Sequence, residues 1–288
     1  MVRLGIIGVG RVGGEVAYLS ALLGLIDDLV LFDIVAPLLH AQVLDLKQSG
    51  LEIAISTDTA GFKDADICIF VAGLPRNPDI KTRSDLLRYN LPVAQECIKF
   101  LEGFSGILIT VTNPMDINNY YLCKKAGIPR EHCIGFGGQL DSARFALVVE
   151  RFGITGFPFV LGEHGDHQVP VFSSLSQPVS YPQREEILGE LRGASMEVIK
   201  GKGGTVFGPT LHITQLIRAI TDNKNNLLPC SCVLNGEYGI SGCSLGVPAK
   251  IGRNGIQGIE EWDLDDWERE KMDEAAKFIT DLIRRTIT

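Results

Sequence analysis

The sequence of 288 residues lacks long hydrophobic runs, an excess of basic residues and any cysteine pattern typical of a metal site. Its longest strongly apolar stretch without a charge, Val16–Ile26, is far shorter than the roughly 20 residues that a helix needs to cross a bilayer. A secretory leader is not expected either, because a glycine-rich turn and Arg11 interrupt the apolar segment that follows Met1. We therefore expect a cytoplasmic protein without a membrane partner.

Basic residues are outnumbered, with 27 Lys and Arg against 35 Asp and Glu and a net charge of −8. This balance excludes a uniformly basic nucleic-acid surface, so no nucleic-acid partner is expected. The seven cysteines contain no C-x-x-C pair and have no histidines at zinc-finger spacing. Because several lie in apolar runs, as Cys68 does, we interpret them as buried reduced thiols and expect no metal.

The sequence does have 45% hydrophobic residues, and in its first half they form short apolar runs that alternate with helical patterns. These runs are typical of strands buried on both faces: Val2–Gly8, Leu29–Asp33, Ile53–Ser56, Asp66–Ala72, Gly106–Val111 and Cys133–Phe136. Helices are predicted between them, over Val12–Leu25, Leu38–Gln48, Ser84–Leu101 and Met115–Ala126. Pro92 predicts a kink or a break in the third helix. The alternation predicts the α/β class, with a Rossmann-type doubly wound parallel sheet.

The pattern changes after Gly137. One strand-like run, Phe157–Leu161, stands among helices predicted over Gln139–Phe152, Arg184–Lys200, Leu211–Thr221 and Asp265–Arg285. This half is predicted to be a mixed α+β domain. We therefore expect two domains, residues 1–137 and residues 138–288.

A glycine-rich turn follows the first predicted strand and opens the first predicted helix, in the order Gly8-Val9-Gly10-Arg11-Val12-Gly13. In this spacing the first glycine permits a tight turn, the second lets backbone approach a pyrophosphate, and the third lets helix and strand pack closely. Asp33 ends the next strand, where a carboxylate can accept hydrogen bonds from an adenosine ribose and repel a 2′-phosphate. Together these residues predict a site for NAD rather than NADP.

Charged side chains gather at three other places in the sequence. His164 directly follows a strand, Asp141 and Arg144 stand three apart on one face of a predicted helix, and Arg76 and Arg83 lie in the loop after the fourth strand. In a doubly wound sheet, the loops after the strand carboxyl ends surround the ligand crevice. A histidine, a carboxylate and several arginines near a nicotinamide indicate proton transfer on an anionic substrate.

These residues stand in ordered motifs that resemble the malate and lactate dehydrogenases, most of all the lactate-dehydrogenase-like malate dehydrogenases. The resemblance covers almost the whole chain. Besides the glycine turn it includes Val111-Thr112-Asn113-Pro114-Met115-Asp116, Leu140-Asp141-Ser142-Ala143-Arg144-Phe145, Gly162-Glu163-His164-Gly165-Asp166 and Gly236-Glu237-Tyr238-Gly239-Ile240.

The resemblance implies a role for each of the charged residues. His164 is the implied proton donor and acceptor, and Asp141 orients its imidazole and stabilises the charged form. Arg83 is implied to polarise the reacting C–O bond. Arg144 is implied to bind the C1 carboxylate, which suits its planar guanidinium.

Further positions are also implied by the resemblance. Asn113 binds both substrate and cofactor, with a cis bond to Pro114, while Asn90 lies near the nicotinamide and Val111 lines the cofactor groove. Thr205 matches a position in the substrate pocket, and capping of a helix after Gly204 is an equally good interpretation of it.

Arg76 bears on the choice of substrate. Malate dehydrogenases carry arginine at this loop position, where lactate dehydrogenases usually carry glutamine, so the resemblance implies malate and oxaloacetate as the small dicarboxylate substrates. Pyruvate would leave the guanidinium buried and unpaired. The loop between Arg76 and Arg83 is one residue longer than is usual in the family, which makes Lys81 an alternative cation.

The expected activity is therefore that of an NAD-dependent malate dehydrogenase, which is an oxidoreductase. The tricarboxylic acid cycle is one pathway in which such an enzyme is expected to act. The alternatives are a lactate or other 2-hydroxyacid dehydrogenase and a non-catalytic NAD-binding protein. An NAD- and metal-dependent glycosidase would need a cysteine–histidine metal pair, which the sequence does not reveal. The resemblance also implies a homo-oligomer, with a tetramer as the first choice and a dimer as the second.

Overall fold

A computed structural model describes residues 1–76, 80, 82 and 84–287. Its first half forms a parallel sheet in the order β3-β2-β1-β4-β5-β6. The strands are β1 (Arg3–Ile7), β2 (Asp28–Phe32), β3 (Ala54–Ser56), β4 (Ile67–Phe70), β5 (Ile107–Thr110) and β6 (Cys133–Gly135). Every residue of β4 and β5 is buried, as continuous apolar runs predict. The prediction of a doubly wound α/β domain is confirmed.

Helices connect these strands as the sequence predicts: α1 (Arg11–Leu22), α2 (Ala36–Gln48), α3 (Leu87–Cys97) and α4 (Met115–Ala126). Of the kink or break predicted at Pro92, the break is wrong, because α3 continues through that residue. Proline removes the hydrogen bond to the carbonyl four residues earlier, which belongs to Arg88. Arg88 lies at the exposed surface, where water can satisfy that carbonyl.

The second half contributes five strands and four helices over the described residues: α5 (Gly138–Arg151), β7 (Val160–Gly162), β8 (Gln168–Pro170), α6 (Tyr181–Lys202), α7 (Phe207–Asp222), β9 (Asn226–Asn235), β10 (Ser241–Gly252), β11 (Gly255–Ile259) and α8 (Asp266–Thr286). Strands β9 and β10 form a long antiparallel hairpin that the sequence did not reveal. Strand β9 also pairs antiparallel with β6, through Ile134 with Cys232 and Gly135 with Ser231. The second half therefore extends the sheet of the first.

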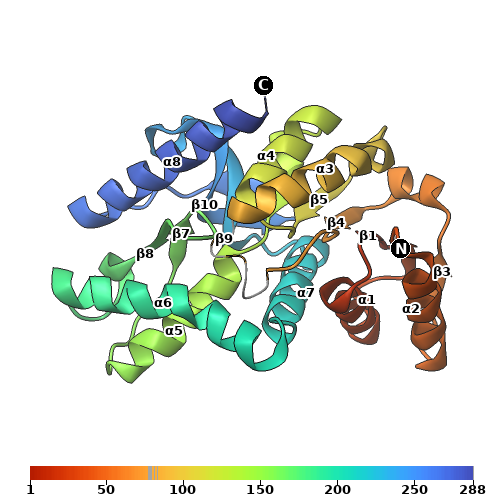
Figure 1. The fold of residues 1–288 in the computed structure, drawn as a ribbon, viewed down its shortest axis with the longest axis horizontal. Coiled ribbons are helices and arrows are strands. Elements are labelled where there is room, and N and C mark those ends of the chain that lie inside the picture. The colour runs from red at the N-terminus through yellow and green to blue at the C-terminus, as the bar shows by residue number, and fades with distance from the viewer. Residues whose placement is uncertain (77–79, 81, 83, 288) are drawn as a thin grey trace.

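Helices cover both faces of this shared sheet. In Figure 1, α3, α4 and α8 lie on its upper side, whereas α1, α2 and α7 lie on its lower side. A smaller hydrophobic cluster lies away from the main core, around Phe145, Phe172 and Trp267. The loops that leave β1, β4, β5 and β6 open onto one cavity, because residues from each of them line it. This edge of the sheet carries the candidate site.

Within the described part of the chain, no helix is both long and apolar enough to span a membrane. All seven cysteines lie in that part, and each is a buried free thiol, in agreement with their sequence interpretation.

Candidate active site

The glycine turn between β1 and α1 has the geometry that its spacing predicts. Gly8 has a φ of +101°, and a Cβ there would lie 2.5 Å from the backbone of Ala72. A Cβ on Gly13 would lie 2.0 Å from the carbonyl oxygen of Gly8. Gly10 differs, since no described atom outside Gly10 and its two chain neighbours lies within 4 Å of the Cβ it would carry. Gly8 and Gly13 are therefore needed for close packing, whereas Gly10 leaves room for a ligand.

Helix α1 begins immediately after this open space. Gly10 is its N-cap residue and provides no side-chain cap, so the first backbone N–H groups face the space in front of the helix. Such unpaired N–H groups and the helix dipole favour a phosphate. The turn therefore fits the pyrophosphate of a dinucleotide.

Asp33 lies beside the turn, directly after β2. Its Oδ2 accepts a hydrogen bond from the backbone N–H of Val9 at 2.9 Å, and its Oδ1 accepts one from the N–H of Val35 at 2.9 Å. The carboxylate is half-buried and keeps lone pairs for further donors. It thus fixes the turn while remaining able to accept hydrogen bonds from a ribose.

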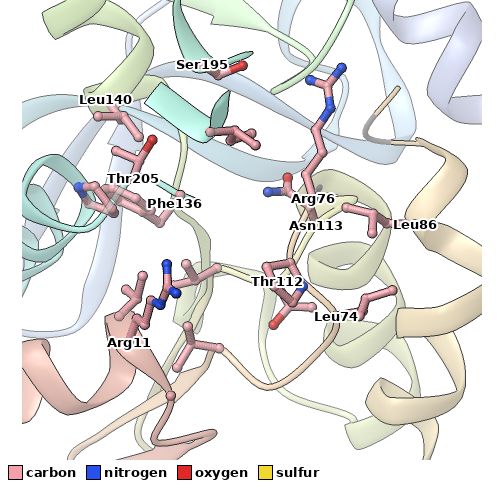
Figure 2. Close-up of a pocket in the computed structure, with 18 of the residues that line it drawn as sticks. Arg11, Leu74, Arg76, Leu86, Thr112, Asn113, Phe136, Leu140, Ser195 and Thr205 are labelled. Atoms are coloured by element: carbon pink, nitrogen blue, oxygen red, sulfur yellow. The ribbon is translucent and has the colours of Figure 1, made fainter. Parts of the chain in front are cut away.

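A cavity of about 440 Å³ joins the two halves of the chain in front of the turn. Ten of the predicted site residues line it: Gly10, Arg11, Val12, Gly13, Arg76, Val111, Asn113, Arg144, His164 and Thr205. Figure 2 shows part of this wall, with Arg11 on one side of the cavity and Arg76 on the other. Gly8, Val9, Asp33, Asn90 and Asp141 do not line the cavity but support residues near it. The structure therefore brings most of the predicted site together.

His164 and Asp141 form a buried pair at the cavity wall. His164 Nδ1 lies 2.5 Å from Asp141 Oδ2, and Arg144 Nη1 donates to Asp141 Oδ1 at 3.0 Å. Asp141 and Arg144 lie one turn apart on α5, so their predicted shared face is confirmed. With Nδ1 held by the carboxylate, Nε2 is the ring nitrogen that a ligand in the cavity would meet. The pair can therefore accept and return a proton while Asp141 compensates the positive charge on the ring.

A second carboxylate holds the backbone of His164. Asp116, at the start of α4, accepts a hydrogen bond from the His164 N–H at 2.8 Å and another from Ser231 Oγ at 2.5 Å. Ser231 in turn contacts Ser244 Oγ at 2.8 Å. Burial, together with the nearby charge of Glu163, raises the pKa of Asp116 to about 8. A buried polar network therefore fixes the loop that carries His164.

Two residues of this support were missed by the sequence analysis as functional positions. Asp116 is one of them, and its place in the same motif as Asn113 is a usable signal for it. Gly137 packs directly on the imidazole, since a Cβ there would lie 2.4 Å from His164 Cγ. Nothing in the sequence distinguishes that glycine from other glycines at strand ends.

Asn90 and Asn113 connect the loops that follow β4 and β5. The buried Asn90 amide donates to the carbonyl of Asn113 at 2.7 Å, and its Oδ1 accepts from the N–H of Leu74 at 2.7 Å. The Asn113–Pro114 bond is cis, as expected. Among the described residues, the buried Oδ1 of Asn113 has no hydrogen-bond partner, and Asn113 lines the cavity. This oxygen is available to a ligand, which again fits a bound dinucleotide.

Of the remaining predicted residues, some line the cavity and others lie outside the described part of the chain. Arg76 lines the cavity, and its Nε donates to the carbonyl of Ile80 at 3.1 Å. Arg83 and the alternative cation Lys81 lie outside the described residues. Thr205 lines the cavity, but α7 begins at Phe207 after a different N-cap residue, so the capping interpretation of Thr205 is wrong.

Arg11 reaches from the glycine turn to the end of α6. Its Nη1 donates to the carbonyl of Lys202 at 3.5 Å, and the side chain also lies close to Gly203. In the described part of the chain, no three His, Cys, Asp or Glu side chains are placed to hold a metal ion.

Comparisons with known proteins cover both halves of the chain. The family profile described as the lactate/malate dehydrogenase NAD binding domain matches residues 2–135, and the profile of the alpha/beta C-terminal domain of the same family matches residues 139–287. A malate dehydrogenase from Natronomonas pharaonis is 38% identical over 98% of each chain. An L-lactate dehydrogenase from Bacillus velezensis is 32% identical over 98% of this chain and 96% of the relative.

A solved structure gives the same picture in three dimensions. The malate dehydrogenase from Archaeoglobus fulgidus in complex with NADH superposes with a TM-score of 0.89 at 31% identity, over 100% of both chains. The similarity therefore extends through the turn, the cavity and the shared sheet alike.

Proposed function

The chain belongs to the lactate/malate dehydrogenase family, and on this premise we propose that it is an NAD-dependent malate dehydrogenase. The observation that carries the proposal is the presence of Arg76 and Arg144 in the cavity that also contains His164. Malate and oxaloacetate have two carboxylates, whereas lactate and pyruvate have one. Two guanidinium groups beside one acid–base pair suit a dicarboxylate, because each carboxylate then has a cationic partner.

The cofactor of this family domain is NAD, and the glycine turn with Asp33 fits it. We propose that Gly8, Val9, Gly10, Arg11, Val12 and Gly13 hold the pyrophosphate, Asp33 the adenosine ribose, and Asn90, Val111 and Asn113 the nicotinamide end. When bound, the cofactor would supply the redox chemistry: its oxidised form, NAD+, would accept a hydride from malate, and its reduced form, NADH, would donate one to oxaloacetate. The chain itself must bind and orient the substrate and move one proton.

His164 is proposed to move that proton. In malate oxidation its Nε2 takes the proton of the substrate hydroxyl, and in oxaloacetate reduction it returns a proton to the carbonyl oxygen. Asp141, at 2.5 Å from Nδ1, keeps the ring in the required orientation and favours its charged form. Because Asp116 holds the backbone of the same residue, neither ring nor loop needs to reorganise during the transfer.

Substrate positioning is proposed to depend on the arginines and two polar side chains. Arg144 binds the C1 carboxylate and is itself fixed by its bond to Asp141. Arg76 binds the distal carboxylate, and Arg83 polarises the reacting C–O bond. Asn113 and Thr205 contact the substrate from opposite halves of the chain.

The proposal is tested by replacing Arg76 with glutamine, which removes the charge at the position that separates the two substrate classes. We expect Arg76→Gln to lower kcat/KM for oxaloacetate by on the order of 10²- to 10⁴-fold while pyruvate reduction stays the same or rises. The measurement is the rate of NADH oxidation with each substrate, and the same reaction with NADPH is the control for cofactor choice. Arg192→Gln is the matched control, because Arg192 is an exposed arginine on α6 that does not line the cavity.

The outcomes separate the alternatives. Equal loss with both substrates would show that Arg76 does not select the dicarboxylate. A wild-type preference for pyruvate would identify a lactate dehydrogenase instead. Absence of turnover with any 2-oxoacid, despite NADH binding, would favour the non-catalytic alternative.

We also propose that the protein is a homo-oligomer, with a tetramer preferred over a dimer. Helix α2 supports self-association, because Leu46 is its one buried residue while Leu44 is 47% exposed. On the neighbouring α7, Phe207 is 76% exposed, and it shares a surface groove with Tyr18 of α1. A cytoplasmic location is proposed because the seven cysteines are free thiols, as is usual in a reducing compartment.

A further inference from the structure

One polar side chain of the cavity wall is used neither by the fold nor by the proposed mechanism. Ser195 lies on α6, is 7% exposed and lines the cavity. Its Oγ is buried and has no hydrogen-bond partner among the described residues. A buried hydroxyl without a partner is unfavourable, so the position calls for an explanation.

The local helix does not provide one. A serine within a helix commonly donates to the carbonyl four residues earlier, here that of Leu191, but no such bond is formed. The other buried residues on this stretch of α6 are apolar, with Leu191 one turn before Ser195 and Ile199 one turn after it. Ile199 also lines the cavity. Ser195 thus places a single polar atom on a hydrophobic helix face that closes the cavity.

The position of Ser195 in the cavity indicates which ligand group it meets. Figure 2 shows Ser195 and the guanidinium of Arg76 toward the same end of the view, far from Arg11 and the glycine turn. The hydroxyl therefore belongs to the substrate end of the cavity and not to the pyrophosphate end. At that end the proposed function places the distal carboxylate of the substrate.

We infer that Ser195 is a specificity-determining residue whose hydroxyl donates a hydrogen bond to the distal carboxylate of oxaloacetate and malate, alongside Arg76. The inference rests on the proposed function. A carboxylate oxygen satisfies the buried donor, whereas the methyl group of pyruvate leaves it unpaired. Ser195 therefore favours a dicarboxylate through a hydrogen bond that forms with oxaloacetate and cannot form with the methyl group of pyruvate.

The test compares the wild-type enzyme with Ser195→Ala and with Ser20→Ala. Ser20 is the matched control, because its Oγ is also buried without a partner among the described residues, but it lies on α1 and does not line the cavity. The measurements are kcat and KM for oxaloacetate and pyruvate with NADH, and the melting temperature of each variant.

Ser195→Ala is expected to lower kcat/KM for oxaloacetate by on the order of tenfold to a hundredfold, mainly through KM, the usual effect of losing a hydrogen bond to a charged group. Pyruvate reduction should stay within about twofold of wild type, and Ser20→Ala should change neither reaction. Neither variant should melt at a lower temperature, because each loses a hydroxyl that had no partner.

Two other results would overturn the inference in different ways. If the wild-type enzyme prefers oxaloacetate and Ser195→Ala keeps the wild-type ratio of the two substrates, the role of Ser195 is wrong while the proposed function stands. If the wild-type enzyme prefers pyruvate, the proposed function fails and the inference fails with it.

Discussion

His164 is held by two carboxylates that act on different parts of the same residue. Asp141 contacts the imidazole and Asp116 the backbone N–H. Their surroundings differ, because Asp141 also binds Arg144, whereas Asp116 is buried near the charge of Glu163. A protonated Asp116 can still accept from His164 and can donate its own proton to Ser231. The support of the loop that carries His164 therefore does not require a negative charge at Asp116.

This difference predicts how stability depends on pH. The pKa of Asp116, about 8 in the folded protein, is higher than the value near 4 of an unfolded aspartate, so the folded state binds the proton more tightly. The stabilisation from protonated Asp116 is therefore fully present below about pH 4 and is lost as pH rises toward 8. We expect Asp116→Asn, which is always neutral and keeps one acceptor and one donor, to flatten the fall in melting temperature between pH 5 and 8.

The measurement is the melting temperature of both proteins by calorimetry across this range. Asp64→Asn is the control, because Asp64 has an exposed side chain at the surface. Parallel curves for wild type and Asp116→Asn would contradict the prediction.

Among single residues, sequence reasoning found the charged residues of the candidate site and missed the small residues that hold them in place. His164, Asp141 and Arg144 were identified from their charge, their spacing and the family resemblance. Gly137 and Ser231 are small, common residues, and their contribution arises only when elements far apart in the chain meet around His164. No pattern within a short stretch of sequence indicates that such distant elements lie side by side.

Among the elements, the parallel strands were predictable and the long hairpin was not. A strand such as β4, buried on both faces, reads as a continuous apolar run. Strands β9 and β10 instead contain serines and glycines, and Pro229 pairs opposite Pro248. Proline is a poor indication of a central strand because it cannot donate to the ladder.

Helix α8 provides a test of local stability. Asp265 caps it by accepting from the N–H of Glu268 at 3.0 Å, within a complete capping box, and it also forms an ion pair with Arg184 at 2.6 Å. We expect Asp265→Ala to lower the free energy of unfolding by about 1–3 kcal/mol, because it removes the cap and leaves the buried guanidinium unpaired. Calorimetry should show a reduced melting temperature.

The neighbouring Asp266→Ala is the matched control. Asp266 is exposed, lies in the first turn of α8 and is not the capping residue. If Asp266→Ala lowered the free energy of unfolding as much as Asp265→Ala does, negative charge near the helix start, rather than the cap and the ion pair, would be what stabilises α8.

For the whole molecule, the exposed apolar residues of α2 and α7 predict self-association. We expect light scattering after size-exclusion chromatography to give a multiple of the chain mass for the wild type. The double variant Leu44→Glu with Phe207→Glu should lower that multiple, because it buries two charges at the proposed interface. Leu147→Glu, on α5 and 65% exposed, is the control and should leave the mass unchanged. A monomeric wild type would contradict the proposed oligomer.

The division into residues 1–137 and 138–288 stays a prediction at this scale. Its basis in the sequence is the change of pattern after Gly137. The sheet itself is not divided there, because strands from both halves of the chain belong to it. The sequence carries the order of the elements, but not the pairing of β6 with β9, because a pairing between distant strands leaves no periodic signal in either strand.

That pairing also has a consequence for synthesis of the chain. About ninety residues separate β6 from β9, and at ribosomal rates of about 5–20 residues per second they take roughly 5–18 seconds to make. Until then the nascent chain has a parallel sheet whose β6 edge lacks its neighbour, and an open edge favours pairing with other chains. The brevity of β6, only three residues, limits that exposure. We therefore expect the pairing of β9 with β6 to be the step that protects this edge of the nascent chain from aggregation.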